Sequence, residues 1–199
     1  MRIVVGMSGA TGAIYGIRLL EVLKAAGDVE THLIMTTPAK QAIAFETDYS
    51  VAQVSALASV VYDARDVGAA LSSGSFKTAG MVIAPCSIRT LSGIANSYDE
   101  NLLVRAADVM LKERRRLVLL LRETPLHLGH LRLMVAAAEY GAVIMPPVPA
   151  FYIRPQTIDE IVNQTVGRVL DQLGIEADIF SRWQGLREGF RDDSTASTS

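Results

Sequence analysis

The chain has 199 residues, the size of one domain with a full hydrophobic core. Its 19 basic and 21 acidic residues give a formal net charge of −2, so composition offers no general attraction for nucleic acid. Half of the residues are hydrophobic, yet the longest apolar stretch, residues 131–152, is interrupted by Arg132, Glu139 and three prolines, which argues against a membrane span.

The first sixteen residues predict a strand, a glycine loop and a helix. Residues 3–5 are a β-branched apolar run, three glycines follow, and an apolar stripe at helical spacing begins at Ile14. A loop of this kind before a helix can hold a phosphate, and Ser8 and Thr11 add hydroxyl donors. The spacing Gly-x-x-Gly-x-x-Gly matches neither the dinucleotide fingerprint nor a P-loop. We therefore favour a mononucleotide phosphate over a tight turn that binds nothing.

Strand-like and helix-like segments alternate along the rest of the chain. Further strands are predicted at residues 29–35, 60–62, 81–84, 117–121 and 142–145, with a turn at residues 85–87. Helices are predicted at residues 39–45, 50–58, 88–95, 102–113, 128–140 and 157–173. This order predicts a single α/β domain over residues 1–185, with a Rossmann-like, doubly wound parallel sheet of about six strands. The polar segment 186–199 is predicted to be a disordered tail.

Composition also bears on assembly and location. A mean hydropathy of +0.27 without a membrane span suggests apolar subunit interfaces, so we expect a homo-oligomer. Cys86 is the single cysteine, which excludes an internal disulfide framework. The first strand begins at Arg2, and no signal peptide is expected. The cytoplasm is the expected location.

Ligands of such sheets bind at the carboxyl ends of the strands, so the strand-end residues are the candidates. In a site for NAD, an acidic residue usually ends the second strand. Thr36 occupies that position here. This residue counts against a nicotinamide dehydrogenase.

Several cations are candidates for a phosphate site. Arg105 and Lys112 lie seven residues apart and share one helix face, Arg122 follows a strand, and Arg168 lies in the last helix. If they converge, they would hold a dianionic phosphate. The apolar surroundings of Arg105 favour an ion-paired or ligand-bound role. The run of arginines at 114–116 is interpreted as a solvated face.

Other polar residues have two interpretations each. Glu123 and Glu46 are either acid–base groups or structural charges, and Tyr152 either reaches a ligand or packs. Cys86 is more typical of a small core residue than of a nucleophile. The histidines have no metal-ligand spacing, and the only Asp-Asp pair lies in the tail, so no metal site is predicted.

The ordered motifs resemble those of the UbiX family of flavin prenyltransferases over residues 1–185. These motifs are Ser8-Gly-Ala-Thr-Gly-Ala13, Glu46-Thr-Asp48, Ser72-Ser-Gly-Ser75, Pro85-Cys-Ser-Ile-Arg-Thr-Leu91, Arg105-Ala-Ala-Asp108, Leu111-Lys-Glu-Arg114, Arg122-Glu-Thr-Pro125, Pro146-Pro-Val-Pro-Ala-Phe-Tyr152 and Arg182-Trp-Gln-Gly185. The resemblance implies prenyl transfer from dimethylallyl monophosphate to N5 and C6 of reduced FMN, without a metal. It further implies a dodecamer whose product, prenylated FMN, serves UbiD-type decarboxylases.

The resemblance also implies roles for individual residues. The flavin-binding set is Gly9, Ala10, Thr11, Thr36, Ser87, Ile88, Arg89, Thr90 and Arg122. The set that holds the prenyl phosphate is Arg105, Lys112, Tyr152 and Arg168, with Trp183 closing the site, and the dodecamer allows these residues to come from neighbouring subunits. The catalytic set is Glu123, Glu46 and Ser87, of which the two glutamates would manage protons. Two alternatives stay open: an FMN-dependent decarboxylase of the same fold, and a flavin carrier subunit without catalysis.

Overall fold

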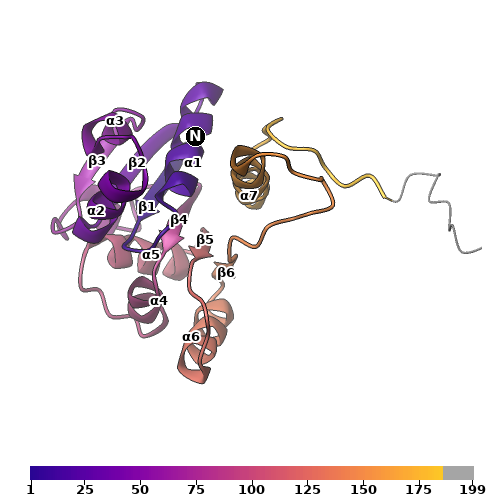
Figure 1. Cartoon of the computed structure of the whole chain (residues 1–199). Coiled ribbons are helices and arrows are strands. Elements are labelled where there is room, and N and C mark those ends of the chain that lie inside the picture. Colours follow the sequence, from indigo (N-terminus) through magenta and orange to yellow (C-terminus); the bar gives the residue numbers. More distant parts are fainter. Residues whose placement is uncertain (186–199) are drawn as a thin grey trace, which may run out of the picture.

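A six-stranded sheet lies at the centre of the computed structural model, which describes residues 1–185 (Figure 1). Its strands are β1 (Arg2–Met7), β2 (Glu30–Met35), β3 (Val60–Asp63), β4 (Gly80–Cys86), β5 (Arg116–Leu121) and β6 (Val143–Ile144). Neighbouring strands are parallel throughout, in the order β3-β2-β1-β4-β5-β6. This is a doubly wound order whose direction reverses between β1 and β4. The predicted Rossmann-like fold is confirmed.

Helices cover both faces of the sheet (Figure 1). The helices whose buried residues join the first core cluster are α1 (Ala13–Ala26), α2 (Thr37–Glu46), α3 (Val51–Ser55) and α7 (Ile158–Gln172). Those that join the second cluster, on the opposite face, are η1 (Ala70–Ser72), α4 (Ile88–Ala95), α5 (Leu102–Lys112) and α6 (Leu128–Glu139). Arg18 of α1 also donates to Asn163 of α7 at 2.5 Å, which ties the last helix to the first.

The central strands are apolar on both sides because both faces are covered. In β1, Ile3, Val5 and Met7 pack in the cluster under α1, whereas Val4 packs in the cluster under α5. All four side chains are fully buried. The alternation follows from the two-residue period of a strand, and it explains why the sequence shows continuous apolar runs here.

The predicted turn at residues 85–87 is wrong, because β4 continues through Pro85 to Cys86. The pairing of β4 with β5 shifts register between Ile83 and Cys86, so the missing N–H of proline costs no ladder bond. The carbonyl of Pro85 instead accepts the backbone N–H of Ser8 at 3.1 Å. Strand β6 is also shorter than predicted, with two residues.

Within residues 1–185, no helix combines the length and hydropathy needed to cross a bilayer. The tail predicted at residues 186–199 lies outside the described residues.

Gly16 of α1 packs directly against β4, and this contact yields a test of the packing. A Cβ at this position would overlap the carbonyl oxygen of Ala84 and lie 2.9 Å from Cε of Met7. We expect Gly16→Ala to lower the free energy of unfolding by about 1–3 kcal/mol, measured by denaturant titration, despite the better helix propensity of alanine.

The matched control is Gly68→Ala, where the nearest atom to the new Cβ is Asp66 Oδ1 at 3.5 Å. That change should stay within about 0.5 kcal/mol of the parent protein. Equal losses in the two variants would contradict the packing that we describe.

Candidate active site

A cavity of about 410 Å³ opens at the carboxyl ends of the strands. We call it the strand-end cavity. The predicted residues that line it are Gly9, Thr36, Ser87, Ile88, Arg89, Thr90 and Glu123. Three other predicted flavin contacts, Ala10, Thr11 and Arg122, are absent from its lining. The strand-end rule therefore finds the cavity, and most of the predicted flavin residues meet there.

Two helix N-termini form walls of this cavity. Ser87 caps α4: its Oγ accepts from the N–H of Thr90 at 3.3 Å and donates to Thr90 Oγ1 at 3.1 Å. Thr36 caps α2 by accepting from the N–H of Ala39 at 3.2 Å. Helix N-termini present unpaired N–H groups and a positive dipole end. The cavity is thus suited to a ligand with an anionic group.

The N-terminus of α1 differs from the prediction, because a carboxylate of the protein already binds there. Glu46 Oε2 accepts from the N–H groups of Gly12 at 2.7 Å and Ala13 at 3.1 Å. Gly12 has a φ of 97°, a left-handed conformation that favours glycine. We expected a ligand phosphate at the start of α1. At these two amides the anion is instead the carboxylate of Glu46, from the last turn of α2.

Two of the predicted charged residues that line the strand-end cavity are already hydrogen-bonded within the chain. Arg89 forms a two-point ion pair with Glu100, with distances of 3.1 and 2.9 Å, and this hydrogen bonding raises the pKa of the Arg89 guanidinium. Glu123 accepts from the N–H of Thr124 at 3.0 Å. Both are held in place by these contacts.

The sequence prediction missed Arg65, Glu100 and Asn101, which also line the cavity. Arg65 pairs with Asp63 at 2.7 Å, and these hydrogen bonds hold the pKa of Asp63 well below its usual range. The signal for Arg65 is the carboxyl end of β3, where the strand-end rule applies. Glu100 and Asn101 precede α5 and follow no strand, so that rule does not find them.

A second, open cavity of about 730 Å³ lies beside α7, and we call it the α7 cavity. It is lined by Tyr152, Gln164, Arg168, Phe180, Arg182 and Trp183. Tyr152 and Trp183 meet edge to face, with ring centroids 5.4 Å apart. Three of the residues predicted to hold or close over the prenyl phosphate, namely Tyr152, Arg168 and Trp183, are therefore brought together.

Asp171 orders the cations of the α7 cavity. It accepts from Arg182 at 2.7 and 2.9 Å and from Arg168 at 2.9 Å. Hydrogen bonding to Arg182, with a smaller effect of Arg168, lowers the pKa of this carboxyl. Arg182 belongs to the motif Arg182-Trp-Gln-Gly185, but the sequence analysis does not predict it as a site residue.

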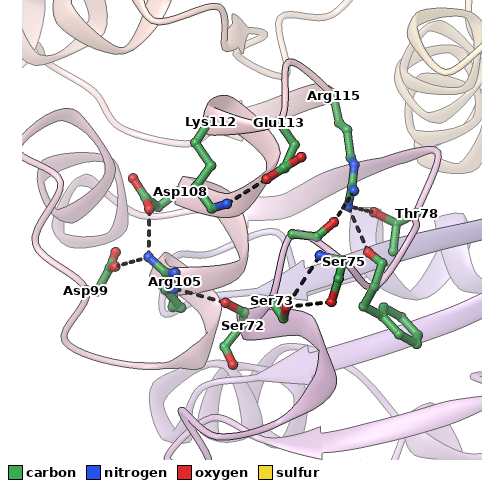
Figure 2. A network of polar contacts seen from close by, with 12 residues as sticks. Ser72, Ser73, Ser75, Thr78, Asp99, Arg105, Asp108, Lys112, Glu113 and Arg115 are labelled. Carbon is green, nitrogen blue, oxygen red and sulfur yellow. Dashed lines mark hydrogen bonds and ion pairs between the residues drawn. The ribbon is translucent and has the colours of Figure 1, made fainter.

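The α5 cations lie elsewhere, and they line neither cavity. Figure 2 shows Arg105 directed at Asp99 and Asp108, with distances of 3.0 and 2.9 Å. Lys112 contacts Glu113 at 2.6 Å. The predicted convergence of Arg105, Lys112 and Arg168 is not found within one chain.

Two further residues are structural. The prediction that Arg115 is a solvated charge is wrong. Its guanidinium donates to the carbonyls of Gly74 and Phe76 and so fixes the loop before β4 (Figure 2). Cys86 is fully buried, and burial raises the pKa of its thiol to about 12. It is a core residue, as expected.

Comparison with known proteins supplies what geometry alone does not. The family model described as Flavoprotein matches residues 1–170. Flavin prenyltransferase UbiX of Escherichia coli strain K12 is 66% identical over 186 residues, covering 92% of this chain and 98% of that protein. The chain belongs to the UbiX family of flavin prenyltransferases. The family resemblance predicted from the motifs is confirmed.

Solved structures of UbiX proteins agree with this membership. AnUbiX (PadA1), in complex with FMN and dimethylallyl pyrophosphate, superposes with a TM-score of 0.91 at 50% identity, covering 93% of this chain and 98% of its own. A dodecameric FMN-dependent UbiX-like decarboxylase from Escherichia coli O157:H7 gives the same score and identity, covering 93% and 100%.

The contact of Glu46 with α1 yields a second prediction. Glu46→Ala removes a charge-assisted acceptor from two N–H groups, so we expect the free energy of unfolding to fall by about 1–2 kcal/mol. Glu46→Gln should retain part of this stabilisation, because an amide oxygen still accepts hydrogen bonds from the two N–H groups. Denaturant titration measures both changes.

The control is Glu139→Ala. Glu139 is the last residue of α6, so its charge lies at the unfavourable end of that helix dipole. Its removal should not lower the free energy of unfolding. If Glu46→Ala is equally harmless, the carboxylate does not stabilise the start of α1.

Proposed function

We propose that this chain transfers the dimethylallyl group of dimethylallyl monophosphate to N5 and C6 of reduced FMN. The bond between the allylic carbon and the phosphate oxygen breaks, and the phosphate leaves. The new carbon bonds to N5 and C6 replace two hydrogens, while the alkene of the prenyl group takes up one proton. Prenylated FMN and inorganic phosphate are the products.

The strand-end cavity carries this proposal. It lies where the order of the strands reverses, which is the usual ligand position in such sheets. Its volume of about 410 Å³ falls in the range of small-molecule sites, roughly 300–1,000 Å³. Hydroxyls of Thr36, Ser87 and Thr90 and the N-terminus of α4 suit the ribityl and phosphate parts of FMN. The residues present therefore fit FMN.

The prenyl phosphate requires a second set of residues, which we propose to be shared between subunits. Arg105 and Lys112 lie on α5, whereas Tyr152 and Arg168 line the α7 cavity. A neighbouring copy that presents its α7 cavity to α5 would bring these cations together. The dodecameric state of a solved relative supports such an arrangement.

Each proposed residue has a role in breaking the allylic bond. Lys112 and Arg168 stabilise the negative charge that develops on the leaving phosphate, and the hydroxyl of Tyr152 donates to it. Holding the allyl group beside the flavin replaces a bimolecular encounter. Glu123, which lines the strand-end cavity, carries protons to and from the reacting atoms. For Glu46, whose carboxylate binds the first amides of α1, the same role is proposed from the family resemblance alone. Ser87 orients the flavin from the lining of the strand-end cavity, and Trp183 closes over the prenyl group. Arg122, which follows β5, is assigned to the flavin from the family resemblance alone.

Three parts of the proposal concern what lies outside the site. We expect the product to be delivered to a UbiD-type decarboxylase and the enzyme to work in the cytoplasm as a homo-oligomer. Delivery is implied by the family resemblance, and the homo-oligomer by the resemblance together with the apolar composition of the chain.

The direct test incubates the protein with reduced FMN and dimethylallyl monophosphate under anaerobic conditions. Mass spectrometry of the released flavin should show a gain of one C5H8 unit, and phosphate should appear in equal amount. Flavin that is bound but unchanged in mass would indicate a carrier. Carbon dioxide release from an acid substrate, with unchanged flavin, would indicate a decarboxylase.

Lys112→Ala tests the role of the α5 cation. Losing a contact made mainly in the transition state should cost about 2–4 kcal/mol of barrier, or about 30- to 1,000-fold in turnover. FMN affinity should be unchanged. The control is Lys24→Ala, a surface lysine near the end of α1 whose ammonium donates to the carbonyl of Ala56. Near-normal turnover of Lys112→Ala would remove this residue from the site.

Sharing of the site is tested by complementation. Lys112→Ala and Arg168→Ala subunits, each inactive alone, are co-expressed with different tags and purified as mixed oligomers. If the two residues come from different subunits, random assembly should restore about a quarter of the sites. No recovery in verified mixed oligomers would contradict a shared site.

A further inference from the structure

Ser8 is a buried hydroxyl that directly follows β1 and lines the strand-end cavity. Its side chain is 1% exposed. Its Oγ donates to the carbonyl of Pro85 at 3.0 Å and accepts the N–H of Ser87 at 2.8 Å. Both hydrogen-bonding capacities of this hydroxyl are used, in contacts that span almost eighty residues of sequence.

These contacts link β1 to β4 beyond the point where their backbone pairing ends. The register of β1 with β4 runs to Gly6 and Ile83. Beyond that point, the backbone N–H of Ser8 bonds to the carbonyl of Pro85 at 3.1 Å, and the side chain adds its two bonds. Ser8 therefore holds the diverging ends of the two strands together at the base of the cavity.

The position of α4 depends on the same hydroxyl. Ser87, whose N–H Ser8 binds, caps α4 through Thr90 and lines the cavity. Gly9, the residue after Ser8, lines it from the side of β1. One side chain thus sets the spacing between two walls of the cavity, the glycine loop and the first turn of α4.

We propose that Ser8 is a positioning residue for the flavin, acting through Ser87 and Gly9 rather than by chemistry of its own. This inference rests on the proposed binding of FMN. Without the hydroxyl, the N–H of Ser87 loses its buried acceptor, and the first turn of α4 is released from β1. The affinity for FMN should fall, whereas the groups assigned to the prenyl phosphate are left in place.

The test compares FMN binding by Ser8→Ala and by the parent protein, through quenching of flavin fluorescence. We expect the dissociation constant to rise about five- to fiftyfold. The KM for FMN should rise in parallel, with an unchanged KM for dimethylallyl monophosphate. Ser8→Cys, which keeps a weak donor and acceptor, should recover part of the affinity and serves if the alanine variant does not fold.

Thr31→Val is the matched control. Thr31 is also 1% exposed, and its hydroxyl accepts the N–H of Ser59 at 3.0 Å, but this pair lies at the start of β2, far along the strand from the cavity. Its loss should lower stability without changing FMN affinity. Unchanged affinity in Ser8→Ala, or an equal loss in Thr31→Val, overturns the inference. Failure of the parent protein to bind FMN overturns the proposed function instead.

Discussion

The site exists because two neighbouring parallel strands send their helices to opposite faces of the sheet. After β1 the chain enters α1, whose Ile17 packs in the first core cluster, and after β4 it enters α4, whose Leu91 packs in the second. The backbones must therefore part at the carboxyl end, and a crevice opens between them. Groups that reach this crevice come from the loops after the strands and from the first turns of α2 and α4. The rigid strands fix where those loops and helices begin.

Most cations assigned to the ligands are already paired with carboxylates. Within residues 1–185, every cation assigned to the flavin or to the prenyl phosphate, apart from Arg122, has a carboxylate partner in its own chain. The pairs are Arg89–Glu100, Arg105–Asp99, Arg105–Asp108, Lys112–Glu113 and Arg168–Asp171. Partly exposed pairs of this kind contribute about 0–1 kcal/mol each, so a phosphate dianion can take over a cation at little cost. Lys112, with one partner, is more available than Arg105, which has two.

The sequence alone was sufficient for the sheet and for most of the strand-end cavity. Buried strands have a strong apolar signal, and one topological rule turns their ends into a site. Contacts between distant segments were not predictable in this way: Glu46 lies 34 residues from the Gly12 amide that it binds. Likewise, the separation of Lys112 from Arg168 depends on how α5 and α7 pack, which periodicity does not report. The end of β4 was predicted too early because proline usually ends a strand. A register shift in the pairing with β5 accommodates Pro85 inside β4.

The burial of Cys86 has a practical consequence. The chain holds one cysteine, and that thiol is fully enclosed and stays protonated at neutral pH, so alkylating reagents find no native target on the folded protein. A cysteine introduced at the surface becomes a unique attachment point for a dye or spin label. Distances between subunits can then be followed in solution without first removing any natural residue.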